Sequence, residues 1–304
     1  MTGSAAWPDT LADELVTLHD LLRYAITTMG RAEVAHGHGF PDASAEAAYL
    51  IAWYFKLPHD AVGEHLGARA TREERAAFLR LVEQRVSERV PSPYLTGEAW
   101  LGDYRFRVDS RVLIPRSFIA DLLLEGLAPW VPEPEGIARA LDLCTGSGCL
   151  AILLAHAFPD AEVDGADLSA DALEVARSNV VDHGLEDRLH LVQSDVFSAL
   201  GDARYDLIVS NPPYVNAPSM AALPPEYRHE PSLALAAGTD GLDIVHRILA
   251  GAAKHLTDEG VLVVEIGHNR AALEEAYPDV PFTWLSTHAG DDFVFLLTRE
   301  HLAG

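Results

Sequence analysis

The stretch Tyr205-Asp206-Leu207-Ile208-Val209-Ser210-Asn211-Pro212-Pro213-Tyr214 joins a short apolar run to a pair of prolines. The apolar and β-branched residues of positions 205–209 are typical of a buried strand. Because proline cannot continue a hydrogen-bonded ladder, the two prolines end this strand in a rigid loop. The sequence therefore predicts a buried strand whose carboxyl end presents one amide side chain, from Asn211, and one aromatic ring, from Tyr214.

The loop after this strand is rich in hydrogen-bond acceptors. Pro212 and Pro213 have no N–H group, so Asn211 and the neighbouring carbonyls form a patch that accepts hydrogen bonds. An NH2 group on an sp2 carbon fits such a patch. Two acceptors turn its delocalised lone pair toward an electrophile and stabilise the positive charge that develops on nitrogen. The pattern favours chemistry on a planar amino group, although the tetrapeptide alone also fits a tight Pro-Pro turn.

Strands and helices alternate from residue 138 onward. Runs typical of strands occupy residues 140–143, 161–167, 189–193, 205–210, 260–266, 282–287 and 293–298, and helical runs occupy residues 149–158, 170–183, 241–255 and 269–276. This order predicts right-handed crossovers and a doubly wound, mostly parallel α/β sheet of seven strands. Only residues 288–292 separate the last two strands. Because they are too few for a crossover helix, we expect the last strand to be antiparallel.

A glycine-rich segment, Asp142-Leu143-Cys144-Thr145-Gly146-Ser147-Gly148, follows the first strand of this sheet. Glycine lets the backbone turn tightly and approach a ligand, and ligands bind at the carboxyl ends of the strands in an open sheet. The segment lacks the G-x-G-x-x-G pattern of a phosphate-binding loop and is weak evidence by itself. Asp167 strengthens it, because a carboxylate at the end of the second strand can accept both hydroxyls of a ribose.

Asp195 follows the third strand. We expect its carboxylate to accept a hydrogen bond from an adenine amino group, with the backbone of Val196 beside the ring. Asp142, Asp167, Asp195 and Asn211 then lie at the ends of four successive strands. Any one aspartate is explained as a helix cap, but four residues in register indicate a nucleoside site. Carboxylates repel a pyrophosphate and tolerate a sulfonium cation, so the set favours S-adenosyl-L-methionine (SAM) over a dinucleotide.

Residues 1–94 carry helical patterns and are interpreted as a small substrate-docking domain. Apolar spacing and capping residues predict helices over residues 11–29, 44–57 and 58–65, and a further helix that begins with a Thr71/Glu74 capping box. Asp42 or Ser44 is expected to cap the second helix. We predict a β-hairpin linker over residues 95–116, with strands at 99–108 and 111–114, and a catalytic domain over residues 117–304.

The chain of 304 residues has a formal net charge of -24. Nucleic-acid binding usually shows as clustered Lys and Arg, so we expect no direct nucleic acid binding. The charge fits either a basic protein partner or a proteome adapted to salt. Cys144 and Cys149 are the only cysteines and are typical of small buried residues in a reduced, cytoplasmic protein.

Two further classes of site are not indicated. The chain shows neither the pattern of a signal peptide nor an apolar run of about 20 residues, so we expect no membrane association. His36 and His38 lie in a short Gly/His turn with no further ligand nearby, and we predict no metal site.

Together these motifs resemble the protein N(5)-glutamine methyltransferases, a family with a small helical N-terminal domain, a hairpin linker and a class I SAM-dependent methyltransferase domain. The resemblance covers nearly the whole chain. Residues 113–117, 142–149, 223–231 and 278–284 resemble the branch that methylates ribosomal protein L three of the large subunit. In the sister branch, which modifies peptide-chain release factors, Gly usually stands where this chain has Cys144 and Trp where it has Val196.

The resemblance implies a role for each motif residue. Asn211, Pro212, Pro213 and Tyr214 would contact the glutamine. Asn211 Oδ1 and the Pro212 carbonyl would accept the two amide hydrogens, and Tyr214 would cover the amide plane, which makes Asn211, Pro212 and Tyr214 the expected catalytic residues. The expected SAM contacts are Asp142, Cys144, Thr145, Gly146, Ser147, Gly148, Asp167, Asp195, Val196 and Asn211.

The implied reaction is methyl transfer from SAM to a glutamine of ribosomal protein L three, a basic protein of the large subunit. Release factors, exocyclic amines of nucleic acids and a SAM-binding module without catalysis stay open as alternatives. Arg228, His229 and Glu230 form either a loop that closes over the substrate or a charged surface, and Arg116 is ambiguous in the same way. Glu265 is expected to satisfy neighbouring backbone groups and is not counted as catalytic.

Overall fold

The computed structural model describes residues 7–131 and 133–302. The chain divides into two compact units. The first contains residues 1–98 and, from much later in the sequence, residues 224–229. The second contains residues 99–223 and 230–304. The sequence places the end of the first domain at residue 94 and gives no indication of its second segment.

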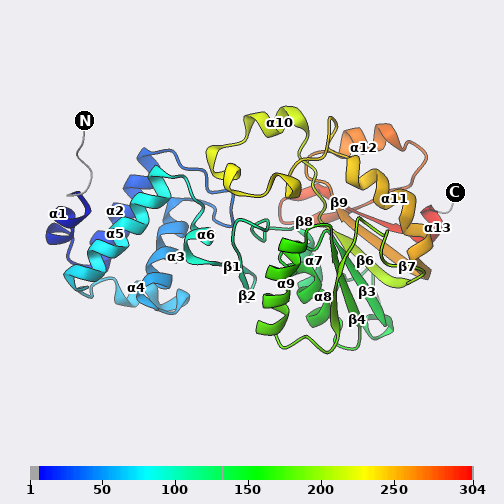
Figure 1. The fold of residues 1–304 in the computed structure, drawn as a ribbon, viewed down its shortest axis with the longest axis horizontal. Coiled ribbons are helices and arrows are strands. Elements are labelled where there is room, and N and C mark those ends of the chain that lie inside the picture. The colour runs from blue at the N-terminus through cyan, green and yellow to red at the C-terminus, as the bar shows by residue number, and fades with distance from the viewer. Residues whose placement is uncertain (1–6, 132, 303–304) are drawn as a thin grey trace. The chain divides into compact units, whose positions relative to one another are not determined.

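The first unit is a helical bundle (Figure 1). Its helices are α1 (Trp7–Glu14), α2 (Leu18–Arg31), α3 (Ala43–Phe55), η1 (His59–Ala61), α4 (Val62–His65), α5 (Arg72–Ser87), α6 (Ser92–Thr96) and η3 (Pro225–His229). The expected caps are confirmed: Asp42 accepts from two backbone N–H groups at the start of α3, and Thr71 and Glu74 form a capping box on α5. Apolar side chains from α2, α3 and α5 meet in one buried cluster.

The prediction of a single helix over residues 11–29 was wrong. Thr17 and Asp20 form a capping box that starts α2. The Asp20 carboxylate accepts hydrogen bonds from the backbone N–H groups of Val16 and Thr17, at 3.0 and 2.9 Å. These bonds hold Thr17 in an extended conformation, which separates α1 from α2. The helical spacing of apolar residues runs through this break, so the spacing alone suggested one helix.

Residues 224–229 contribute a buried carboxylate to the first unit. Glu226 is fully buried and accepts hydrogen bonds from the Ala35 N–H group at 3.1 Å and from Arg89 Nη1 at 3.1 Å. Arg85, also buried, donates to Glu46 at 2.5 Å and to Glu226 at 3.4 Å. His229 Nε2 lies 3.0 Å from the Glu88 carbonyl oxygen. Buried charges need such partners, so these contacts hold the later segment in the helical unit.

The hairpin of the second unit is shorter than the sequence predicts. Its strands are β1 (Glu98–Leu101) and β2 (Tyr104–Arg107), and the chain turns at Gly102, whose φ is +58°. The predicted turn at Asp109-Ser110 and the predicted strand at residues 111–114 were wrong. Glycine, aspartate and serine all favour turns, so the sequence around Gly102 and the sequence Asp109-Ser110 are both suited to reverse the chain. The backbone N–H group of Ile114 donates to the Glu230 carboxylate at 3.1 Å, so it is not available to a hairpin ladder.

The second unit contains a seven-stranded sheet with the order β5-β4-β3-β6-β7-β9-β8. The strands are β3 (Arg139–Leu143), β4 (Glu162–Asp167), β5 (Leu189–Gln193), β6 (Tyr205–Ser210), β7 (Leu256–Glu265), β8 (Thr283–Thr287) and β9 (Gly290–Thr298). Strands β3 to β7 pair in parallel, and β9 is antiparallel to both of its neighbours. The predicted class I methyltransferase sheet with one antiparallel strand is confirmed.

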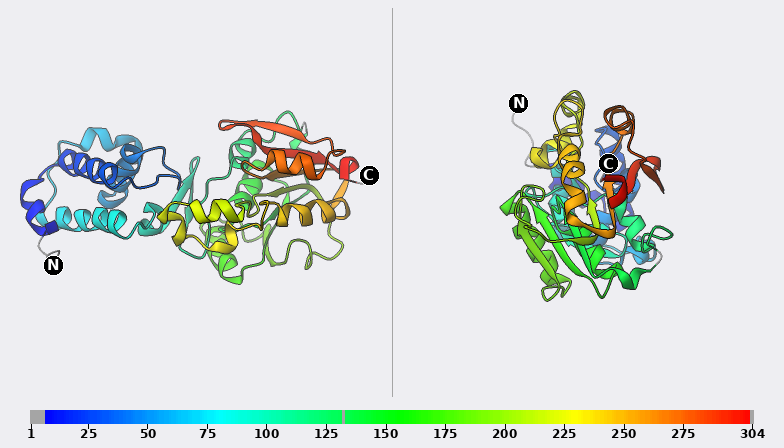
Figure 2. Two further views of the ribbon diagram at one scale, coloured as in Figure 1. Left: turned by 90° about the horizontal axis from the view of Figure 1, so that it is seen from above. Right: turned by 90° about the vertical axis from the view of Figure 1, so that its right-hand side faces the viewer.

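Helices cover both faces of this sheet (Figures 1 and 2). One face carries α7 (Ile119–Leu124), α8 (Cys149–Ala157) and α9 (Ala170–Asp182), and the other carries α11 (Asp243–His255), α12 (Arg270–Ala276) and α13 (Arg299–Leu302). The remaining short helices are η2 (Pro134–Gly136), α10 (Ala217–Ala222) and η4 (Ser232–Ala234). Successive side chains of β6 point to opposite faces of the sheet. Leu207 and Val209 pack on the face covered by α7 and α8, and Ile208 packs on the other face.

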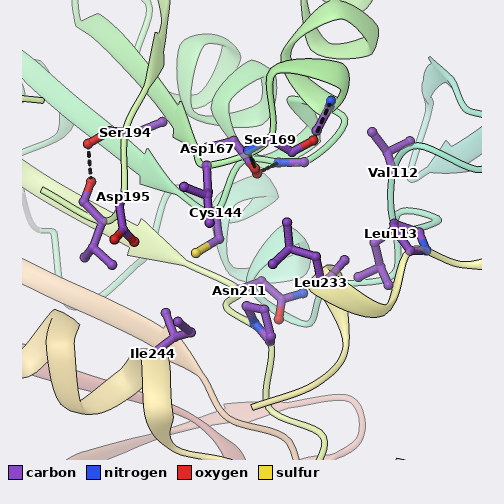
Figure 3. Close-up of a pocket in the computed structure, with 18 of the residues that line it drawn as sticks. Val112, Leu113, Cys144, Asp167, Ser169, Ser194, Asp195, Asn211, Leu233 and Ile244 are labelled. Carbon is purple, nitrogen blue, oxygen red and sulfur yellow. Dashed lines mark hydrogen bonds between the residues drawn. The ribbon is translucent and has the colours of Figure 1, made fainter. Parts of the chain in front are cut away.

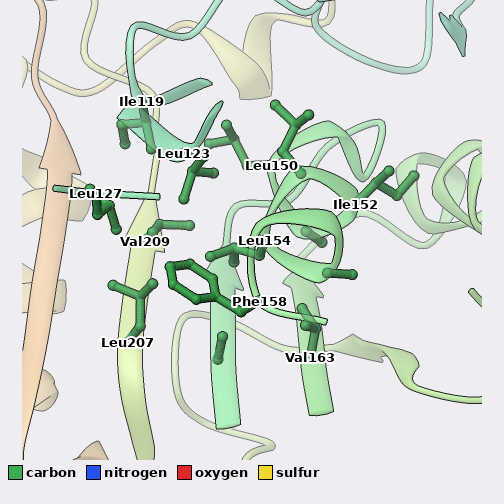
Figure 4. Close-up of a cluster of buried hydrophobic side chains, with 14 of the residues drawn as sticks. Ile119, Leu123, Leu127, Leu150, Ile152, Leu154, Phe158, Val163, Leu207 and Val209 are labelled. Carbon is green, nitrogen blue, oxygen red and sulfur yellow. The ribbon is translucent and has the colours of Figure 1, made fainter. Parts of the chain in front are cut away.

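The apolar layer beneath α7 and α8 fixes the first strands of the sheet. Leu123, Leu154 and Phe158 pack against Leu207 and Val209 of β6 in this layer, and all five are buried (Figure 4). Because both faces of these strands are covered, most residues of β3 and β6 are buried, although β3 and β4 also carry Asp142, Asp164 and Asp167. Within the described residues, no helix combines the length and apolarity that crossing a membrane requires.

Candidate active site

Four parallel strands end side by side and bring the predicted polar residues together. Leu143 of β3 pairs with Ala166 of β4 and with Ser210 of β6, and Asp167 pairs with Gln193 of β5. The strands therefore end at nearly the same level, and their following residues share one edge of the sheet. Cys144, Asp167, Asp195 and Asn211 all lie around one pocket at this edge (Figure 3).

The pocket contains part of the predicted cofactor set. Cys144, Gly146, Asp167, Asp195, Val196, Asn211 and Pro213 line it. Asp142, Thr145, Ser147, Gly148, Pro212 and Tyr214 are not among its lining residues. Arg111, Val112, Leu168, Leu233 and Ile244 also line the pocket, and the sequence analysis did not identify them. Apolar wall residues carry no motif of their own, so only their proximity in the fold reveals them.

Asp142 supports the glycine-rich loop from beneath. Its Oδ2 atom accepts hydrogen bonds from Thr145 Oγ1 at 2.6 Å and from the Ala151 N–H group at 2.9 Å. The side chain is 1% exposed, and burial raises its pKa to about 7. Its Oδ1 atom is buried without a hydrogen-bond partner among the described residues. Asp142 thus shapes the loop that faces the pocket.

The loop itself adopts an unusual backbone. Cys144, Gly146 and Gly148 have φ angles of +61°, +54° and +82°. A Cβ atom on Gly148 would lie 3.2 Å from the Cβ atom of Ala176, so glycine also permits the close approach of α9. Within this loop the Gly146 N–H group donates to Asp167 Oδ2 at 2.8 Å, which joins the loop to the end of β4.

Asp167 is oriented by backbone groups toward the pocket. Oδ2 accepts from Gly146 and Oδ1 accepts from the Ser169 N–H group at 2.8 Å. Burial raises its pKa above the usual value for aspartate. Each carboxylate oxygen has a second lone pair, so the carboxylate can still accept two hydroxyl donors from a ligand. This geometry fits the vicinal hydroxyls of a ribose.

The third aspartate is paired with a cation that sequence reasoning missed. Asp195 Oδ1 lies 2.8 Å from Arg247 Nη2, and both side chains are about half exposed, at 48% and 47%. Arg247 belongs to α11, and Ile244 of the same helix faces the pocket near Asp195 (Figure 3). Val196 has a φ of +53° and is 9% exposed. Val196 and Ile244 supply apolar surface suited to a planar ring.

Asn211 lies at the carboxyl end of β6 and lines the pocket next to Leu233 (Figure 3). Tyr214, three residues later, donates its hydroxyl to Glu265 Oε1 at 3.1 Å, while its carbonyl accepts from Asn269 Nδ2 at 2.7 Å. Glu265 ends β7, next to β6 in the sheet. The expectation that Glu265 satisfies backbone groups holds for the Phe118 N–H group, at 2.9 Å, but is incomplete because Tyr214 and Ser117 also donate to it.

Part of the pocket wall, here called the roof, comes from two loop segments, residues 111–113 and residues 231–236. The Glu230 carboxylate joins the two segments: it accepts from Arg116 Nη1 at 2.5 Å, from Arg116 Nη2 at 2.8 Å and from the Ile114 N–H group at 3.1 Å. The Val215 N–H group donates to the Leu235 carbonyl at 2.8 Å and folds the same loop back toward the motif. Glu230 and Arg116 are therefore structural partners at the pocket, whereas His229 belongs to the helical unit.

No cluster of three or more His, Cys, Asp or Glu side chains suitable for a metal ion occurs in residues 7–131 and 133–302. Cys144 and Cys149 are free thiols whose pKa values are raised by burial. Raised thiol pKa values disfavour the thiolate, the form that acts as nucleophile and metal ligand. Besides the Cys144 thiol, the polar side chains that line the pocket are those of Arg111, Asp167, Ser169, Ser194, Asp195 and Asn211.

Known proteins of similar sequence are methyltransferases. Residues 120–222 match the family model of the methyltransferase small domain. The ribosomal protein uL3 glutamine methyltransferase of Bordetella pertussis is 57% identical over 289 residues, which is 95% of this chain and 97% of that protein. The protein of that name from Neisseria meningitidis serogroup B is 54% identical over 96% of each chain. In Burkholderia pseudomallei the identity is 50%, over 94% of this chain and 95% of the relative. The chain belongs to the family of ribosomal protein uL3 glutamine methyltransferases.

Proposed function

We propose that this enzyme transfers a methyl group from SAM to the side-chain amide nitrogen of a glutamine in ribosomal protein uL3. The names of its relatives support this substrate. The observation that carries the chemistry is the convergence of Asp167, Asp195 and Asn211 on one pocket, with Pro213 of the Asn-Pro-Pro-Tyr loop in its lining.

The pocket fits SAM on two features of the structure. Asp167 is fixed by two backbone N–H groups and retains acceptor capacity for the ribose hydroxyls. Val196 and Ile244 offer apolar surface to the adenine, and the carboxylates favour a cation over a phosphate. When bound, SAM would supply an electrophilic methyl group on a sulfonium ion, and breaking of the S–CH3 bond would leave S-adenosyl-L-homocysteine as the product. We also propose that Asp195 exchanges its contact with Arg247 for one with the adenine amino group.

The motif residues would act on the glutamine by position and dipole. Asn211 Oδ1 and the Pro212 carbonyl accept the two amide hydrogens, which turns the nitrogen lone pair toward the methyl group. The same acceptors stabilise the positive charge that grows on nitrogen during transfer. Tyr214 covers the amide plane. None of Asn211, Pro212, Pro213 and Tyr214 is a strong base at neutral pH, so the excess proton leaves to water after transfer.

The acidic charge of the chain suits this substrate. With a formal net charge of -24, the enzyme attracts a basic ribosomal protein and repels free nucleic acid. We propose that it acts in the cytoplasm on uL3 through protein contacts, without direct nucleic acid binding. Residues 1–94 are proposed as the substrate-docking domain, residues 95–116 as the linker and residues 117–304 as the catalytic domain.

A competition assay tests this proposal. Purified enzyme is incubated with SAM labelled in its methyl group and an equimolar mixture of recombinant uL3, a peptide-chain release factor and ribosomal RNA. We expect label in uL3, on a glutamine identified by fragmentation mass spectrometry. Label in the release factor alone, or in RNA alone, would contradict the proposed substrate.

A further inference from the structure

Glu265 is a buried carboxylate beside the Asn-Pro-Pro-Tyr loop. Its side chain is 1% exposed, and burial raises its pKa above the usual value for glutamate. Oε2 accepts from Ser117 Oγ at 2.6 Å and from the Phe118 N–H group at 2.9 Å, while Oε1 accepts from the Tyr214 hydroxyl at 3.1 Å. Its hydrogen-bond donors are uncharged, and the charge of the Arg116 guanidinium opposes part of the rise in its pKa. A buried carboxylate is costly, and its position needs an explanation beyond capping α7.

Tyr214 is held at three points by the end of β7 and the turn that follows it. Its hydroxyl donates to Glu265, and its carbonyl accepts from Asn269 Nδ2 at 2.7 Å. The ring lies so close to Gly267 that a Cβ atom there would be 2.7 Å from Tyr214 Cε2 and 2.9 Å from Cδ2. Asn269 holds the backbone of Tyr214, Gly267 limits where its ring can move, and Glu265 holds the hydroxyl end of the ring.

We propose that Glu265 is a positioning residue for methyl transfer, which acts by fixing the ring of Tyr214 parallel to the substrate amide. The inference rests on the proposed function, because Tyr214 matters for the rate only if a planar amide binds beside it. A carboxylate suits the task since it accepts from Tyr214 with one oxygen while the other is anchored by Ser117 and Phe118. Two independent anchors leave the acceptor little freedom to follow a moving ring.

The alternative is that Glu265 only supports the start of α7. A double-mutant cycle separates the two roles. Tyr214→Phe keeps the ring and removes the hydroxyl, and Glu265→Ala removes the acceptor. If Glu265 acts through Tyr214, each variant lowers the single-turnover rate on uL3 about 10- to 100-fold, and the double variant is no slower than Glu265→Ala. Multiplicative losses would overturn the proposal.

Ser117→Ala is the matched control. It removes the other side-chain donor to Glu265 and leaves the Tyr214 bond unbroken. We expect its single-turnover rate to fall much less than that of Glu265→Ala, because the Phe118 N–H group still anchors Oε2 and the Tyr214 bond remains. The variant also loses stability because Ser117 accepts from the Ile119 N–H group at 3.2 Å. A loss of rate as large as that of Glu265→Ala would assign the effect to α7 and contradict positioning.

A second readout needs no activity. With fluorine-labelled tyrosine, the Tyr214 resonance is assigned by its absence in Tyr214→Phe, and ring order is measured from its line shape in the full-length enzyme. We expect one well-ordered environment in wild type and in Ser117→Ala, and averaging over several in Glu265→Ala. An unchanged resonance in Glu265→Ala would overturn the inference. An enzyme that fails to methylate uL3 refutes the proposed function, while the resonance still decides whether Glu265 positions Tyr214.

Discussion

Glu230 accepts hydrogen bonds from both terminal guanidinium nitrogens of Arg116, at 2.5 and 2.8 Å. The Glu230 side chain is fully buried and that of Arg116 is 20% exposed. The pair connects the residues before α7 to residues 231–236, so it holds the two halves of the pocket roof together. A buried, two-pronged pair of this kind fixes geometry as well as charge.

Arg116→Met is therefore expected to lower the free energy of unfolding by about 3 kcal/mol, because it leaves a buried carboxylate without its cation. It should also weaken SAM binding, since the roof loosens. Arg107→Met is the control: Arg107 contacts Asp182 through two nitrogens, but its side chain is 57% exposed, so solvent screens the pair and its loss should leave the free energy of unfolding close to that of wild type. Urea unfolding and calorimetric titration with SAM measure both effects. Equal losses in the two variants would show that the roof does not depend on Glu230.

Asn211→Ala should lower the single-turnover methylation rate roughly 10²- to 10³-fold, as for the loss of one preorganised polar contact. SAM binding should weaken less, because the ribose acceptor Asp167 is untouched. Asn216→Ala removes an amide from the same loop, where it caps α10, and should leave the rate near wild type. A rate near wild type in Asn211→Ala would remove this residue from the mechanism.

Gly267→Ala should disturb Tyr214 without removing any of its hydrogen bonds. The new Cβ atom would lie 2.7 Å from the ring, and the φ of +54° disfavours alanine as well. Gly184→Ala isolates the backbone effect, because Gly184 has a φ of +65° and open space around it. We expect Gly184→Ala to lose about 1 kcal/mol of stability through its backbone and Gly267→Ala to lose more because of the added clash, with only Gly267→Ala losing methylation rate, by about 10-fold or more. If the methylation rate fell equally in Gly267→Ala and Gly184→Ala, backbone strain rather than the contact with Tyr214 would explain the loss.

The pKa of Asp142 makes stability depend on pH. Burial raises this pKa from 3.8 to about 7, so the folded state holds a proton that the unfolded state releases. The stabilising contribution is complete below pH 3.8 and is lost as the pH rises toward 7. The stability of wild type relative to Asp142→Asn should fall by on the order of 2–4 kcal/mol across this window. Urea unfolding at pH 5 and pH 8 measures the difference, and parallel pH profiles would contradict the assignment.

Much of the catalytic unit can be predicted from local sequence patterns. The apolar run and the prolines after it identify strand β6. An aspartate lies at or just beyond the end of each of β3, β4 and β5. These signals are local because alternation, caps and turns depend on nearby residues. Once the strands are known to be parallel, the convergence of Asp167, Asp195 and Asn211 follows from the fold class.

Contacts between distant residues were not predictable in the same way. Tyr214 and Glu265 are 51 residues apart, and Asp195 meets Arg247 only because α11 passes the end of β5. The signal available for Glu265 was its position at the end of β7, next to the strand that carries the motif. The Ile114 N–H group, which a strand at residues 111–114 would need, donates instead to Glu230, 116 residues further along the chain.

The central claim is that the Asn-Pro-Pro-Tyr loop presents a uL3 glutamine to an activated methyl group. The most direct measurement is mass spectrometry of ribosomal proteins from cells that lack this chain, compared with the same cells complemented with wild-type enzyme or Asn211→Ala. The account predicts that uL3 lacks one methyl group in the deletion strain and in the Asn211→Ala strain, and regains it on a glutamine with the wild-type enzyme. A uL3 mass that is identical in all of these strains would contradict it.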